Sequence, residues 1–240
     1  MNLPILKLLG AALMLSWESR FNLARVLWMP LLAGIAVSLA EMRWGPDGGE
    51  DGNAALWALP IFMLTVILAV RSYRVFLLGL DEEHRKRPLS WSLRESRFLF
   101  AMIGVSLAFA LIAVTAGSIL GLLLPDPRQL GRGVLLGLVL VPGAYLASRL
   151  LLAFPAIAVE DSGALQAFRR AWALSRDNAL RILVLCVAVP GAIAWLLGRL
   201  GSVPSVEALS TILVWLLMPA QLAIVAMVYA TLSRQQQPGV

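Results

Sequence analysis

The sequence predicts an all-α integral membrane protein with six transmembrane helices. Hydrophobic residues make up 60% of the 240 residues and charged residues only 14%, whereas soluble domains are about 45–50% apolar and about 25% charged. Six apolar runs reach the about 20 residues that a helix needs to cross the hydrocarbon core. They cover residues 21–40, 54–80, 98–124, 134–159, 179–200 and 208–232. Residues 1–240 are therefore expected to form a single membrane domain.

Basic residues predict the orientation of the spans. All but four of the 20 lysines and arginines lie at one end of the predicted spans. The exceptions are Arg43, Arg128, Arg132 and Arg199. Because cytoplasmic segments are enriched in lysine and arginine, both termini are expected to be cytoplasmic. The net charge of +6 is thus interpreted as a topology signal, and no nucleic-acid partner is expected.

Three similar segments divide the chain into units of comparable length. SRFNLARVL begins at Ser19, SRFLFAMI at Ser96 and SRDNALRIL at Ser175. The predicted units are 1–80, 81–159 and 160–240, each with an amphipathic interfacial helix followed by two spans. Because each unit carries two spans, all three would insert in the same orientation, which predicts a pseudo-threefold arrangement about the membrane normal.

The segments before the spans differ between units. Residues 3–18 are apolar but too short to span, so they are expected to lie in the interface or to insert partly. Residues 81–96 form the most charged stretch of the chain. In unit three, Leu165, Phe168 and Trp172 fall on one helical face and arginines on the other, which is typical of a helix lying in the membrane surface.

Three arginines fall inside predicted spans and are the first candidate site residues. Arg71, Arg74 and Arg149 lie about ten residues from the cytoplasmic boundary, or about 15 Å deep at the rise of a helix. Such side chains either snorkel to the interface or bind a lipid phosphate or anionic ligand. Arg71 and Arg149 are 78 residues apart, whereas the equivalent position in unit three is Met227.

The junctions before the spans carry the remaining candidates, for which two interpretations stay open. Exposed arginines at a helix start attract anions such as headgroup phosphate, and the alternative is a structural elbow with capped helices. The lipid or anion candidates here are Arg20, Arg97, Arg169, Arg170, Arg176 and Arg181. The helix-cap candidates are Ser19, Asn22, Ser175 and Asn178.

Enzymatic chemistry finds little support in the residues. His84 is the only histidine, and no carboxylate lies inside an apolar run, so neither a histidine-based metal site nor a pair of embedded acids is expected. Cys186 is the only cysteine, which excludes an intramolecular disulfide. The sequence therefore predicts no catalytic residue, no metal site and no cofactor.

Residues 155–183, with Pro155, the Glu160–Asp161 pair, Ala167–Trp172 and Asn178, resemble a segment of the YciC-like bacterial six-span inner-membrane family. This family is related to the membrane domain of glycerophosphoryl diester phosphodiesterases. The resemblance implies a multi-pass protein of the bacterial inner membrane with a role in envelope or lipid maintenance. It does not carry over the phosphodiesterase activity, because the chain has no acid and histidine set for it.

Two functional hypotheses follow. The leading one is a non-enzymatic membrane protein that binds or organises phospholipid, or a membrane-protein partner or second copy, through basic cytoplasmic elbows. The alternative is a small transporter or channel for a lipid or anionic solute, with a pathway between the helix pairs.

Overall fold

The computed structural model describes residues 4–44, 51–79, 89–123, 132–160, 163–203 and 206–236, and these are helical apart from short turns. The helices are α1 (Ile5–Glu18), α2 (Arg20–Trp44), α3 (Asp51–Leu78), α4 (Leu93–Leu123), α5 (Arg132–Leu150), α6 (Ala153–Glu160), α7 (Ala164–Leu174), α8 (Ala179–Leu183), the π-helical turn η2 (Val184–Ala188), α9 (Val189–Gly201) and α10 (Glu207–Gln235).

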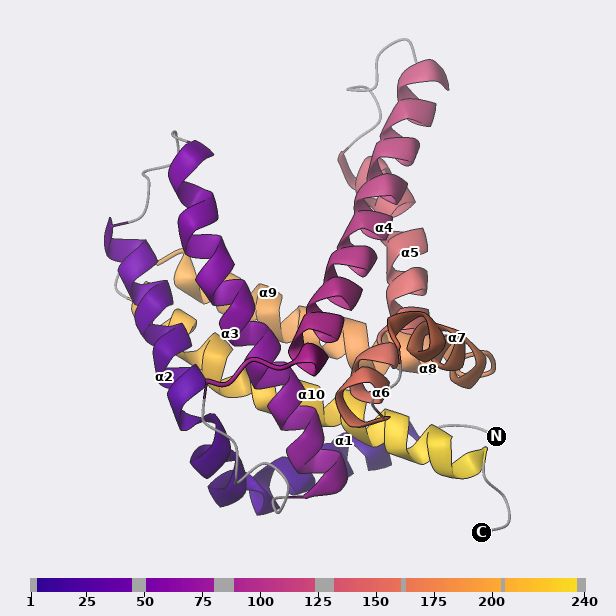
Figure 1. Ribbon diagram of the computed structural model, residues 1–240. Coiled ribbons are helices and arrows are strands. Elements are labelled where there is room, and N and C mark those ends of the chain that lie inside the picture. Colours follow the sequence, from indigo (N-terminus) through magenta and orange to yellow (C-terminus); the bar gives the residue numbers. More distant parts are fainter. Residues whose placement is uncertain are drawn as a thin grey trace.

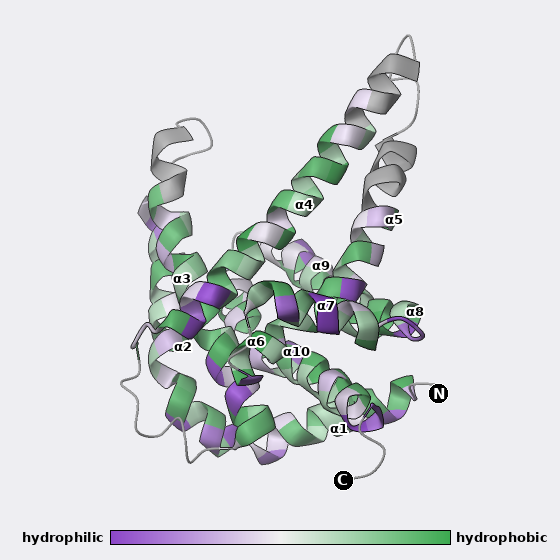
Figure 2. Cartoon of the chain, turned by 45° about the vertical axis from the view of Figure 1, so that its right-hand side comes forward, coloured by the Kyte–Doolittle hydropathy of each residue, from purple (hydrophilic) through white to green (hydrophobic). Residues whose placement is uncertain are grey.

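Two helix hairpins form the arms of a V. Figure 1 shows α2 and α3 in one arm and α4 and α5 in the other, with α9 and α10 crossing behind the point where the arms meet. The shorter helices α1, α6, α7 and α8 lie at the lower end. Figure 2 shows hydrophobic residues along the arms and hydrophilic residues gathered in the lower half, around α7. The molecule is therefore polar at one end and apolar along most of its length.

The expected long apolar helices are confirmed within the described residues. Six candidate spans there are long and apolar enough to cross a bilayer, which indicates a multi-pass membrane protein. Two of them are irregular: a turn at 151–152 separates α5 from α6, and η2 interrupts the run from α8 to α9. The orientation of the spans stays a prediction.

The main hydrophobic core lies at the lower end, away from the tips of the arms. It joins the C-terminal parts of α3 and α10 to α1, α6, α7 and the start of α4. Leu8 and Ala12 of α1 are buried in this core, so α1 packs against the protein as well as presenting an exposed face. A second cluster joins α2, α3 and the middle of α10 around Trp215.

Close helix approach in the second cluster depends on a glycine. A Cβ atom at Gly34 of α2 would lie 2.5 Å from the Trp215 ring of α10, so only glycine permits this contact. The Trp215 Nε1–H donates to Ser38 Oγ at 3.0 Å, which satisfies a buried indole inside the apolar contact. Packing and one hydrogen bond therefore fix α2 against α10.

The three predicted units have different local structures. Units one and three have a separate helix before their first span, α1 and α7. Most of the corresponding segment of unit two lies outside the described residues, and from residue 89 the chain is non-helical until α4 begins at Leu93. The division into repeats at 1–80, 81–159 and 160–240 stays a prediction.

Candidate functional site

The deep arginines of α3 lie inside the protein. Arg71 and Arg74 are 2% and 4% exposed, so neither guanidinium group extends to the surface. Arg71 Nη2 donates to Ser90 Oγ at 3.3 Å, in the segment that leads into α4. Arg74 Nη1 donates to the carbonyl oxygen of Ala158, in α6, at 3.2 Å. The two arginines thus tie α3 to the segments around it.

Arg149 has a similar role at the end of α5. Its Nη2 and Nε donate to the Tyr145 hydroxyl at 2.8 and 3.2 Å, and its Nη1 lies 3.4 Å from both the Trp172 carbonyl oxygen and Ser175 Oγ. The guanidinium carbon also lies 5.1 Å from the Trp172 ring and 5.2 Å from the Tyr145 ring, within cation–π range. Arg149 therefore holds the end of α7 against α5.

Neither of the two sequence interpretations describes these arginines fully. Snorkelling requires a guanidinium group at the surface, and a ligand pathway requires the three groups to line one polar cavity. Arg71, Arg74 and Arg149 are instead buried and bound to protein atoms of neighbouring segments. Only Arg149 borders a groove as well. The sequence could not show this, because their partners are distant in the chain.

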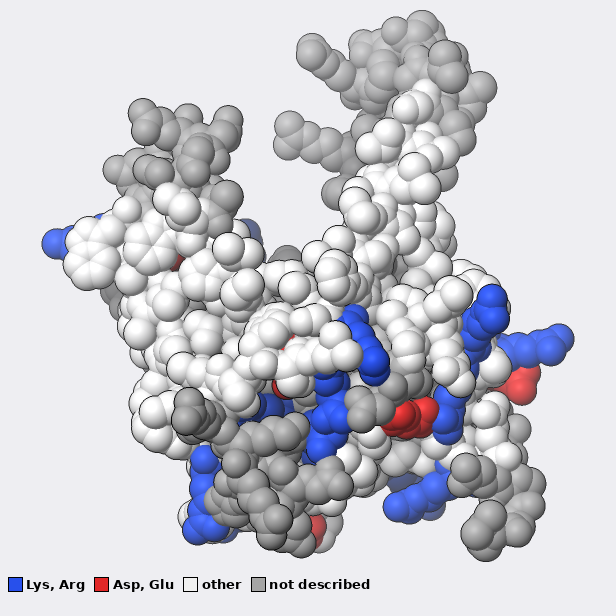
Figure 3. Space-filling model, in the orientation of Figure 1, with Lys and Arg blue, Asp and Glu red and all other residues white. Residues whose placement is uncertain are grey.

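The elbow from α7 to α8 combines exposed basic and apolar side chains. Arg169 and Arg176 are exposed, and so are Leu165 and Trp172, because the packing face of α7 is formed by Ala167, Ala171 and Leu174. Large apolar residues of α7 are thus available to contact lipid. Figure 3 shows Lys and Arg side chains gathered on the lower half of the visible face.

Arg170 differs from the other arginines of this elbow. It forms an ion pair with one carboxylate oxygen of Glu160, while the Tyr229 hydroxyl donates to the other. This network connects α7, α6 and α10. Arg170 is therefore a structural residue of the elbow more than a ligand-binding one.

Arg181 lies between two surface grooves. The first, of about 370 Å³, is bordered by Arg149, Arg176 and Arg181 and by a single acidic residue, Asp177. The second, of about 400 Å³, is bordered by Arg181 and Lys7. The Nη1 atom of Arg181 is buried and has no hydrogen-bond acceptor among the described residues. This arrangement favours an anion, because a buried N–H group without an acceptor costs free energy.

The remaining two arginine candidates border neither of these grooves. Arg20, at the α1–α2 junction, is exposed; its Nη1 donates to the Trp17 carbonyl oxygen at 2.8 Å, and its guanidinium group lies over the Trp17 and Phe21 rings. Arg97 is half-buried in the first turns of α4. The structure thus brings Arg149, Arg176 and Arg181 together and leaves Arg20 and Arg97 elsewhere.

The expected helix caps need correction. Ser175 is the C-cap residue of α7, and its hydroxyl donates to the Trp172 carbonyl oxygen, so it does not cap α8. Asn178 occupies the N-cap position of α8 but its side chain makes no capping hydrogen bond. Ser19 lies between α1 and α2, where its carbonyl oxygen accepts from the Leu23 N–H at 2.8 Å, and Asn22 falls inside α2. Neither Ser175 nor Asn178 therefore caps the start of α8 with its side chain.

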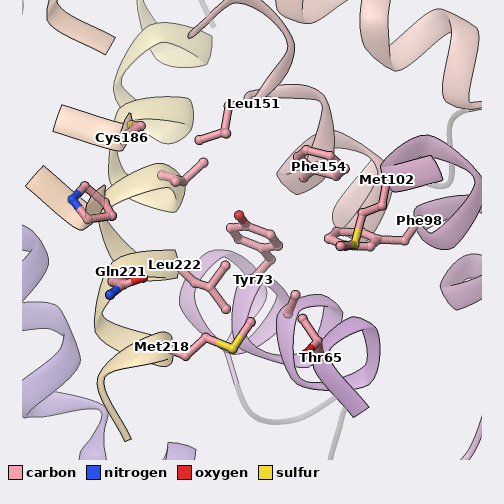
Figure 4. Close-up of a pocket in the computed structure, with 13 residues that line it drawn as sticks. Thr65, Tyr73, Phe98, Met102, Leu151, Phe154, Cys186, Met218, Gln221 and Leu222 are labelled. Carbon is pink, nitrogen blue, oxygen red and sulfur yellow. The ribbon is translucent and has the colours of Figure 1, made fainter. Parts of the chain in front are cut away.

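A cavity that the sequence did not predict lies where the arms meet. It measures about 230 Å³ and is enclosed mainly by apolar side chains of α3, α4, α10 and the segments around Leu151 and Cys186. Tyr73, Thr65 and Gln221 are the polar side chains on its wall besides the Cys186 thiol. Figure 4 shows Tyr73 at its centre. The sequence shows these polar residues inside apolar runs, which could have suggested a site. Only the fold shows that they lie around the same cavity.

Comparisons with known proteins give a family and no function. No curated protein and no solved structure matches the chain. The expected relation to YciC-like proteins and to phosphodiesterase membrane domains stays a prediction. A family model described as a domain of unknown function (DUF7847) matches residues 52–234. This match covers most of the chain and all of α4–α9, and the protein therefore belongs to the DUF7847 family.

Proposed function

We propose that this protein is a non-enzymatic, multi-span protein of the bacterial inner membrane that binds anionic phospholipid through the elbow formed by α7 and α8. In this proposal both termini are cytoplasmic and the elbow meets the inner leaflet. The observation that carries it concerns Arg181: its buried Nη1 has no acceptor in the part of the chain that the structure describes, and the residue borders a groove with two further arginines.

The chemistry of the groove fits a phospholipid headgroup. Arg149, Arg176 and Arg181 outnumber the single carboxylate of Asp177, and guanidinium groups match the oxygens of a phosphate in a bidentate geometry. Leu180 is 75% exposed beside them and offers an apolar surface to an acyl chain. A headgroup phosphate with its chains alongside uses both features at once.

The alternative, a small transporter or channel, has weaker support. It places Arg71, Arg74 and Arg149 at the mouth of a pathway, but Arg71 and Arg74 are bound inside the protein and do not border the cavity between the arms. A membrane-protein partner or a second copy is the other ligand in the leading proposal, bound through the same basic elbow, whose Arg169 and Arg176 side chains are exposed.

The test compares lipid retention by matched variants in nanodiscs that contain phosphatidylglycerol and phosphatidylcholine. Each basic residue near an anionic surface contributes about 1 kcal/mol, so Arg176→Gln with Arg181→Gln should lower the preference for phosphatidylglycerol about 30-fold. Arg199→Gln is the control, because Arg199 is exposed at the end of α9, outside both grooves. No preference in the wild type, or an equal loss in the control, contradicts the proposal.

A further inference from the structure

The cavity between the arms contains a polar group that the described part of the protein leaves without a partner. Tyr73 is 2% exposed, and Figure 4 shows its hydroxyl group pointing from α3 into the cavity. No hydrogen bond of this hydroxyl is found among the described residues, and its oxygen is not one of the fully enclosed unbonded atoms there but faces the cavity. Leaving an O–H group unbonded in an apolar environment costs several kcal/mol. A ligand with an acceptor oxygen would remove this cost.

The shape and position of the cavity restrict the ligand. Its wall is formed largely by side chains such as Phe98, Met102, Phe154 and Leu222, which suits a hydrocarbon chain. Its volume of about 230 Å³ is below the about 300–1,000 Å³ of sites that enclose a whole small molecule. Figure 3 shows the surface hollowed between the two arms above it. The cavity therefore suits part of a longer molecule whose remainder extends between the arms.

We propose that the cavity binds the ester region of a membrane lipid, with the Tyr73 hydroxyl donating a hydrogen bond to an ester carbonyl oxygen. Tyr73 lies five residues before the end of α3 at Leu78, which is about 7.5 Å along the helix axis and less than the about 15 Å expected from the sequence for the neighbouring arginines. If α3 ends among the headgroups, this depth is the boundary of the hydrocarbon core, where lipid ester groups lie. The acyl chain then continues along the apolar wall.

This site is independent of the elbow site. None of the arginines that border the elbow groove borders the cavity, so its ligand needs no phosphate. A neutral diacylglycerol, with ester groups and two chains but no charge, separates the two sites experimentally. Water bound to Tyr73 is the competing occupant, since Thr65 and Gln221 also lie on the cavity wall, and the labelling experiment distinguishes it from a lipid.

The experiment uses the full chain in phosphatidylcholine nanodiscs with a photoactivatable diacylglycerol, and measures cross-linked peptides by mass spectrometry. Tyr73→Phe removes only the hydroxyl oxygen. Because a net hydrogen bond contributes about 0.6–1.5 kcal/mol, cross-linking at cavity peptides should fall about 3- to 10-fold. Tyr229→Phe is the matched control, since Tyr229 does not border the cavity, and it should leave cross-linking unchanged.

Two further measurements distinguish the possible results. A photoactivatable alkane without oxygen should label the wild type and Tyr73→Phe equally. The Arg176→Gln, Arg181→Gln double variant should retain diacylglycerol labelling, so failure of the elbow proposal leaves this one intact. Equal diacylglycerol labelling of the wild type and Tyr73→Phe would overturn the proposal, as would a wild type that is not labelled at the cavity because only water fills it.

Discussion

Replacing Arg149 with methionine should detach the elbow from α5 without a large change in side-chain volume. The arginine contributes one short hydrogen bond to Tyr145 at 2.8 Å, three longer contacts at 3.2 to 3.4 Å and two cation–π contacts. Hydrogen bonds from a charged group contribute about 1.5 kcal/mol or more when short, and cation–π contacts about 0.5 kcal/mol each. The gross loss is about 3 to 4 kcal/mol.

Part of this loss is recovered, because methionine keeps the apolar stem buried and needs no desolvation of a charge. We expect the free energy of unfolding of Arg149→Met to fall by about 2 kcal/mol. The assay is reversible unfolding in mixed micelles with increasing dodecyl sulfate, followed by tryptophan fluorescence. Trp172 contacts the guanidinium group, so its emission should also report local detachment of α7.

Two further variants test the cause of this effect. Arg149→Lys retains the charge but not the planar fork, so it should lose about as much stability as methionine. Arg199→Met should cost less than about 0.5 kcal/mol, because Arg199 is exposed and its guanidinium group contacts, among the described residues, only the Trp195 ring, at 6.0 Å. A methionine variant within about 0.5 kcal/mol of the wild type, or a lysine variant that restores full stability, would refute the reasoning.

The same unfolding assay checks two other predictions. Gly34→Ala should destabilise the protein by about 1 to 2 kcal/mol, because its Cβ would meet the rigid Trp215 ring at 2.5 Å and this strain exceeds the gain in helix propensity. Gly104→Ala, where nothing lies within 4 Å of the new Cβ, should be neutral or stabilising by up to about 1 kcal/mol; equal effects of the two would contradict the packing argument. Glu160→Gln should cost about 1 kcal/mol, since the amide keeps a contact with Tyr229 but loses the ion pair with α7; an unchanged stability would show that the ion pair contributes nothing.

Hydropathy was sufficient to predict the long helices, because a span must be apolar along its whole length. The first run, predicted at 21–40, corresponds to α2, and the last, predicted at 208–232, corresponds to α10. The irregular points were not predicted. The turn at 151–152 and the π-helical turn at Val184–Ala188 lie inside apolar runs, where hydropathy alone does not mark them, although Pro155 and Pro190 lie close by.

The sequence did not predict which residues the buried side chains contact in the folded protein, and the reason is a different one. The sequence shows that Arg71 and Arg149 fall inside predicted spans, but whether each points to lipid, to a cavity or to protein depends on what packs beside it. Ser90 and Ser175, which accept from them, are ordinary polar residues of a loop. The cavity around Tyr73 is formed by side chains from helices far apart in the chain, so no local pattern reveals it.

The hydrogen-bond partners of Arg71 and Arg149 show which segments each arginine connects. Arg71 lies near the end of α3 and binds Ser90, in the segment that leads into α4. Arg149 lies at the end of α5 and binds Ser175, in the elbow that leads into α8. Each arginine thus fixes one helix pair to the entry of the following pair.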